Sequence, residues 1–166
     1  MAVHVETHGD RMTTDLFFIL QLLDRFPDLR LTADLSHFFG GREFAWPVDD
    51  VNHALIHRIL DNAWGVLGRI ASREQVQISL GFPRHQGWME LFTSSWAYSI
   101  PSWRRRAGPD AILTFLCKLG PPSYAITGSD GRELFDRWRE ALVMKDMIRA
   151  LWNQIADEPG SGPNVS

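Results

Sequence analysis

The sequence has a single cysteine, Cys117, which excludes an internal disulfide framework and a zinc site built from cysteines. It also has no surplus of basic residues, because its formal net charge is −3. Binding to nucleic acid or to a membrane surface needs an excess of Lys and Arg, so neither partner is expected. No apolar run is long enough to span a bilayer, and the N-terminal residues MAVHVETHGDR lack the apolar segment of a secretory signal. We therefore expect a cytoplasmic protein.

What the chain does contain is enough apolar sequence for one hydrophobic core. Apolar residues make up 45% of its 166 residues, a content that is too high for a disordered chain. This length supports one domain but is short for two. We expect that domain to extend over residues 1–155. The tail at 156–166 is rich in Gly, Pro and small polar residues and is predicted to be disordered.

Short apolar or β-branched runs alternate along the chain with longer segments of helical periodicity. The short runs predict strands at residues 3–7, 29–35, 64–70 and 111–116. The periodic segments predict helices at about 16–26, 51–59, 88–105 and 132–155, with Pro101 as a candidate break in the third. The segment from the second strand to Pro47 is predicted to be a loop, and residues 71–80 an irregular stretch.

Four strand–helix units in succession predict an α/β fold with a parallel sheet, because parallel neighbours need a crossover helix. Ligands in such folds bind at the carboxyl ends of the strands. The candidate functional residues therefore lie at those ends, at 6–8, 34–37, 67–69 and 117–118. The pattern of strands alone leaves open whether the sheet is doubly wound or part of a barrel.

The segment VETHGDRMTTDLFFILQLLDRFPDLRLTADLSHFF resembles the fifth and sixth βα units of the sugar phosphate isomerase/epimerase family, the xylose isomerase-like TIM barrels. Members of that family often read E-T-H at the end of one strand and D-L-S-H at the end of the next. This chain has the first motif at residues 6–8 and the second at 34–37. The resemblance continues through LGRIASREQVQISLG and LTFLCKLGPPSYAI and extends over residues 3–153.

The resemblance implies the second half of a (β/α)8 barrel, because the family has eight βα units and this chain has four. A half-barrel leaves two strand edges with unpaired backbone groups. A second copy of the chain or a partner half-barrel is therefore expected to cover these edges, unless the chain is a truncated product.

The metal centre of the family has four ligands, Glu, Asp, His and Glu, from successive strand ends. The resemblance places Glu6 and Asp34 at the first two positions, and it makes Glu6 a catalytic proton-transfer group as well. Leu67 and Lys118 stand at the third and fourth positions, where neither can bind a metal. The expected cofactor is a divalent metal (Mn, Mg, Co or Zn), or none. In the second case, we expect the Lys118 ammonium to take the metal's place and pair with both carboxylates.

The remaining matches to the family lie near the position of its substrate. His8 and His37 fall on the histidines of the two motifs, and Arg69 matches an arginine that is a candidate for a phosphate or carboxylate oxygen. Taken without the resemblance, both histidines are equally typical of hydrogen-bonded loop residues. Likewise, Glu6 and Asp34 are typical of structural carboxylates at strand ends.

The implied reaction is a metal-dependent aldose–ketose isomerisation or epimerisation of a small sugar-like or polyol substrate, by proton transfer through an enediolate. Two of the four metal positions and one of the two proton-transfer glutamates are replaced in this chain. The alternative is therefore a catalytically inactive structural or partner subunit with the same scaffold.

Seven tryptophans are present, and most are expected to pack between helices and sheet. Trp96, Trp138 and Trp152 fall on the apolar stripes of the predicted helices. Trp46 lies in the loop after the second strand instead, and it is a candidate substrate contact.

Overall fold

The computed structural model describes residues 3–157 and has four strands in one sheet. The strands are β1 (Val5–Glu6), β2 (Leu31–Ala33), β3 (Ala63–Gly68) and β4 (Thr114–Cys117). They lie in the order β1-β2-β3-β4, and each neighbouring pair is parallel. The predicted α/β fold with a parallel sheet is therefore confirmed.

Each strand is followed by helical structure, as crossover connections require. The helices are α1 (Leu16–Arg25), α2 (Ser36–Gly41), α3 (Asp50–Leu60), α4 (Gln86–Arg106) and α5 (Arg137–Asp157). Two short 3-10 turns, Met12–Thr14 and Pro83–His85, precede α1 and α4. Asp15 and Asp49 cap α1 and α3 by accepting hydrogen bonds from backbone N–H groups in the first turn.

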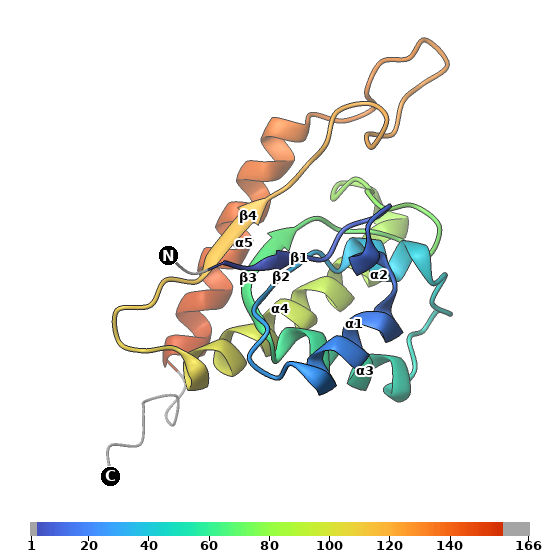
Figure 1. Cartoon of the computed structure of the whole chain (residues 1–166). Coiled ribbons are helices and arrows are strands. Elements are labelled where there is room, and N and C mark those ends of the chain that lie inside the picture. The colour runs from blue at the N-terminus through green and yellow to red at the C-terminus, as the bar shows by residue number, and fades with distance from the viewer. Residues whose placement is uncertain (1–2, 158–166) are drawn as a thin grey trace.

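The core lies between one face of the sheet and the helices. Figure 1 shows α1, α3 and α4 together on one side of the sheet, with α5 running alongside β4. Leu16, Ile19, Leu20 and Leu23 form the buried stripe of α1. Gly68 permits close packing at the end of β3, because a Cβ atom there would overlap the side chains of Phe115 and Met144.

Large apolar side chains remain exposed near the two outer strands. Val3 is 73% exposed just before β1, and Ile112 is 84% exposed just before β4. Within β4, Leu116 is 54% exposed, whereas its neighbour Phe115 packs against the core. Within residues 3–157, β1 and β4 each have one edge without a partner strand. None of the helices in this part of the chain combines the length and apolarity that crossing a bilayer requires.

The prediction of a loop up to Pro47 was wrong, because Ser36–Gly41 forms α2. The backbone N–H of Ser36 donates to the Asp34 carboxylate at the start of this helix. Phe38 and Phe39 are fully buried and anchor it in the core. The four consecutive buried residues 36–39 have no helical periodicity, which is why the pattern suggested a loop.

The last helix begins at Arg137, five residues after the predicted start at 132. The preceding residues form a turn in which Thr127 pairs with Glu133, and the Asp136 carboxylate accepts from the N–H of Arg139 at the helix start. The expected tail began at 156, but α5 continues to 157, and residues 158–166 lie outside the described residues.

Two expectations about the helices concern single residues, Trp138 and Pro101. Trp138 is 74% exposed, so the expectation that it packs between helix and sheet is wrong. It lies in the first turn of α5, beyond the part of the helix that packs on the sheet. Pro101 does not break α4, which runs without interruption to Arg106.

Candidate functional site

The charged residues of the predicted site come together at the carboxyl edge of the sheet. Glu6 is the last residue of β1, Asp34 follows β2, Arg69 follows β3 and Lys118 follows β4. Because all four strands are parallel, their carboxyl ends lie at one edge. We refer to the set Glu6, Asp34, Ser36, His37, Arg69 and Lys118 as the strand-end network.

Lys118 links the two outer strands to the middle of the sheet. Its Nζ atom lies 2.7 Å from Glu6 Oε1 and 3.4 Å from Asp34 Oδ2. The expected pairing of this ammonium with both carboxylates is therefore present. Glu6 and Lys118 remain 44% and 26% exposed, so this end of the network is open to solvent.

Asp34 and Arg69 form the buried centre of the network. Arg69 Nη2 lies 2.7 Å from Asp34 Oδ2, and the two side chains are 1% and 0% exposed. The second oxygen of Asp34 accepts from the N–H and the hydroxyl of Ser36, at 3.1 and 2.5 Å. The same hydroxyl accepts from Arg69 Nε at 2.9 Å. Both charges thus have hydrogen-bond partners, as buried charges require.

His37 is the titratable member of the network that is neutral at neutral pH. Arg69 Nη2 lies 2.7 Å from His37 Nε2, and because a guanidinium can only donate, that nitrogen is an acceptor. Burial lowers the pKa of His37 to about 4, against the opposing effect of the Asp34 carboxylate. The positive charges of Arg69 and Lys118 also lower the pKa. With His37 neutral, two acidic and two basic side chains balance each other.

His8 lies beside this network, and its ring centroid is 4.5 Å from that of His37. Its Nδ1 atom is 2.7 Å from the carbonyl oxygen of Gly9. Thr7 joins the first strand to the second, because its hydroxyl accepts from the N–H of Asp34 at 2.8 Å. The two sequence motifs therefore meet in space, through the hydrogen bond between Thr7 and Asp34 and the contact between the rings of His8 and His37.

Trp46 and Leu67 lie apart from the polar contacts of the network. The Trp46 ring packs against Trp88, with 4.6 Å between the centroids, and it lies beside Gly87 at the start of α4. Trp46 is 50% exposed, whereas the apolar side chain of Leu67 is 6% exposed.

Sequence reasoning missed two contacts with the segment after β4, one made by Gln77 and one made by Arg69. The side-chain amide of Gln77 bonds both backbone groups of Gly120, at 2.7 and 3.0 Å. The guanidinium of Arg69 lies over the Tyr124 ring, 5.0 Å from its centroid. Figure 1 shows that the chain between β4 and α5 extends beyond the sheet.

Sequence reasoning also did not single out Ser36 as a site residue, and the only signal for it was its place within the D-L-S-H motif.

The residues at the four positions that the resemblance matches to metal ligands do not fit a divalent cation. Lys118 contacts Glu6 and Asp34, and Arg69 contacts Asp34, so a metal ion would have to approach two fixed positive charges. Two unit charges 4 Å apart repel by roughly 4 kcal/mol at an effective dielectric constant of 20, and a divalent ion doubles this. Among the residues that the structure describes, no group of three or more His, Cys, Asp or Glu side chains is placed to hold a metal.

The fold and the network define an α/β protein with a balanced cluster of charges at the carboxyl edge of a parallel sheet. Comparisons with models of protein families, with curated proteins and with solved structures found no match.

Proposed function

We propose that this chain is a divergent sugar phosphate isomerase/epimerase-like protein in which bonds between side chains have replaced the metal centre. In this proposal it is a partner subunit, located in the cytoplasm, that does not carry out metal-dependent isomerisation. One observation carries the proposal: Lys118 Nζ contacts both Glu6 Oε1 and Asp34 Oδ2. An ammonium in this place supplies the positive charge that two adjacent carboxylates require, and it fixes the ends of three strands.

The chemistry of the remaining residues supports the same conclusion. Epimerisation inverts one carbon, so it needs one group that removes a proton and a second group, on the opposite face, that returns it, whereas aldose–ketose isomerisation can use a single base. Of the two glutamates implied by the resemblance, only Glu6 is present. Asp34 cannot replace the second, because it is fully buried and its oxygens are held by Arg69 and Ser36.

An active isomerase is the second candidate, and the exposure of Glu6 favours it. With 44% of its side chain exposed, Glu6 can reach a proton on a small sugar-like or polyol substrate. Lys118, at 2.7 Å, would then stabilise the oxyanion that forms, in place of the metal. His8 is also partly exposed beside these residues.

The partner that we propose is a second copy of the chain or another half-barrel. The free edges of β1 and β4 and the exposed Val3, Ile112 and Leu116 side chains support this assignment. Parallel pairing of β4 with β1 of the next copy would satisfy the unpaired backbone groups of both edges. Neither nucleic acid nor a membrane is part of the proposal.

Calorimetric titration with Mn²⁺ tests the proposal on the native chain and on the double variant Leu67→His with Lys118→Glu. We expect no binding to the native chain and measurable binding to the double variant, in which all four ligand types are present. Lys145→Glu, on α5, is the matched control for the change of charge, and we expect it to bind no Mn²⁺. Micromolar binding to the native chain that Glu6→Ala abolishes would overturn the proposal.

Hydrogen exchange separates the two candidates. The native chain is incubated in D2O with small aldoses and ketoses, and deuterium at the carbon next to the carbonyl is followed by NMR. No enzyme-dependent exchange is expected for a partner subunit. Exchange that is lost in Glu6→Gln would establish the second candidate instead.

A further inference from the structure

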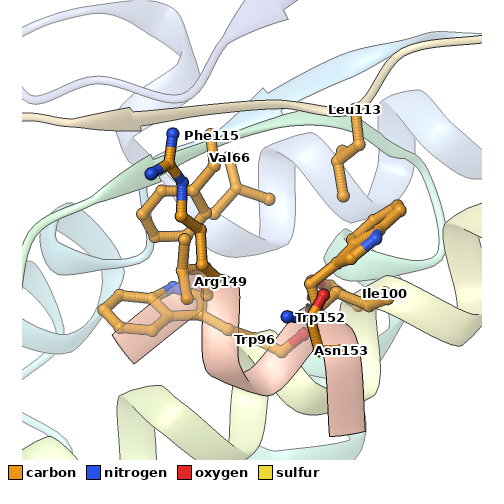
Figure 2. A pocket seen from close by; sticks show the side chains of 10 residues that line it. Val66, Trp96, Ile100, Leu113, Phe115, Arg149, Trp152 and Asn153 are labelled. Carbon is orange, nitrogen blue, oxygen red and sulfur yellow. Dashed lines mark hydrogen bonds between the residues drawn. The ribbon is translucent and has the colours of Figure 1, made fainter. Parts of the chain in front are cut away.

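A cavity of about 420 Å³ lies between the sheet and the last two helices, and the proposed function does not use it. Its walls come from β3, β4 and the residues just before β4, α4 and α5, as Figure 2 shows. The volume is in the range typical of pockets for small molecules, about 300–1,000 Å³. The lining residues are Val66, Trp96, Ser99, Ile100, Leu113, Phe115, Ile148, Arg149, Trp152 and Asn153.

The spacing of these residues along the strands and along α5 explains why they line the same cavity. Leu113 and Phe115 are two positions apart and lie on the same side of an extended chain. Val66 is the register partner of Phe115 in the neighbouring strand, so its side chain lies beside them. On α5, Ile148 and Trp152 are four positions apart and lie on the same face.

The aromatic side chains in the cavity wall are held in place by contacts with neighbouring side chains. The Arg104 guanidinium lies over the Trp152 ring, 4.2 Å from its centroid, and it donates to the Trp152 carbonyl oxygen at 3.3 Å. On the opposite side, Trp96 meets Phe115 edge to face, with 5.2 Å between the ring centroids. The cavity is thus largely formed in advance of any ligand, which lowers the entropy lost on binding.

One buried donor in the cavity wall has no hydrogen-bond partner among the described residues, and one exposed cation at the cavity has no ion pair with them. Trp96 is 1% exposed, and its indole Nε1 has no hydrogen-bond partner among the described residues. A buried N–H group without a partner is unusual, because it loses its bonds to water on folding. Arg149 is exposed on α5, and no ion pair joins it to another side chain of residues 3–155.

The lining set contains no Asp or Glu, so the cavity presents positive charge without a balancing negative charge. Figure 2 shows Arg149 along one side of the cavity and Trp152 along the other. An aromatic ring placed between these walls would contact Trp152 and Phe115. A carboxylate attached to that ring would pair with the guanidinium, in the two-pronged geometry that arginine favours.

We propose that this cavity is a binding site for a small aromatic carboxylate. The apolar walls take the ring, and Arg149 pairs with the carboxylate. The site lies on the helix-covered face of the sheet, whereas the strand-end network lies at its carboxyl edge. The result of the following test is therefore independent of the Mn²⁺ titration.

Calorimetric titration with 3-phenylpropionate tests the proposal, with 3-phenylpropanamide as a neutral compound of nearly the same shape. We expect the acid to bind at least about tenfold more tightly than the amide, because only the acid forms a charged pair with Arg149. Arg149→Gln should remove this preference. Arg139→Gln, an exposed change on the same helix away from the cavity, should leave it unaltered.

A variant that fills the cavity provides a second measurement. Leu113→Trp places a larger ring in the space, and we expect it to abolish binding of the acid while the chain remains folded, as judged by circular dichroism. Three results would each overturn the proposal: no binding of the acid by the native chain, equal binding of acid and amide, or retention of the preference in Arg149→Gln.

Discussion

Arg69 and Asp34 form a salt bridge of 2.7 Å in which neither side chain has appreciable contact with solvent. The guanidinium also bonds Ser36 and His37, so Asp34, Ser36 and His37 are all hydrogen-bonded to this one arginine. The resemblance made Arg69 a candidate contact for a substrate anion. In the folded chain it contacts the residues after β2 instead, and it is a structural centre of the network.

Replacing Arg69 with Met should lower the free energy of unfolding by about 3–5 kcal/mol, because the buried Asp34 charge loses its main partner. Urea denaturation measures the change. Arg73→Met is the control, since Arg73 is 49% exposed and lies 3.9 Å from Glu74. That variant should differ from the native chain by less than about 1 kcal/mol. A loss of similar size in both variants would show that Arg69 has no special role.

Stability should depend on pH through His37. In the folded chain its pKa is about 4, whereas the ordinary value is 6.5. Between these values the unfolded chain binds more protons, so the free energy of unfolding should fall as the pH decreases from 6.5 to 4. The full contribution is about 3 kcal/mol. Denaturation curves of the native chain and His37→Asn at several pH values measure it, and parallel pH profiles would contradict this prediction.

Glu140, on α5, should stabilise the segment before the Pro83–His85 turn through only one of its two oxygens. Oε1 accepts from the hydroxyl of Ser79 and from the N–H groups of Leu80 and Gly81, whereas Oε2 is buried without a partner. Glu140→Ala should lower the free energy of unfolding by about 1–3 kcal/mol, because buried donors lose their acceptor. Glu140→Gln keeps one acceptor and should have a smaller effect. Equal losses, measured by thermal denaturation, would contradict this assignment.

The exposed apolar side chains beside β4 should mediate association. Light scattering coupled to size exclusion should give about twice the chain mass of 19.0 kDa for the native protein. Leu116→Glu should shift the protein towards the monomer, since it places a charge on this surface. Val51→Glu is the control, because Val51 is also an exposed apolar residue but lies on α3. A native monomer, or a dimer that Leu116→Glu leaves intact, would contradict the proposed partner.

The sequence was most informative where periodicity and chain direction decide the structure. The apolar stripe of α1 and the capping aspartates of α1 and α3 placed those helices within a residue or two. The meeting of Glu6, Asp34 and Lys118 was also predictable, because parallel strands bring their carboxyl ends to one edge. The length of the Lys118 side chain then allows it to reach both carboxylates.

The parts that could not be predicted depend on contacts between distant segments. Gln77 and Gly120 bond each other across 43 positions of the chain, and no local pattern records that pairing. The same holds for Tyr124, which lies against Arg69. The short helix α2 was missed because its first four residues are all buried, so that its sequence lacks the alternation of a surface helix.

We propose that the Lys118 ammonium occupies the place of a metal between Glu6 and Asp34. Crystals of the native chain grown with millimolar Mn²⁺ test it most directly, through an anomalous difference map recorded at the manganese edge. We expect no peak between these two carboxylates and a Lys118 Nζ atom within hydrogen-bonding distance of both. A manganese peak bonded to Glu6 and Asp34, with Lys118 turned away, would contradict it.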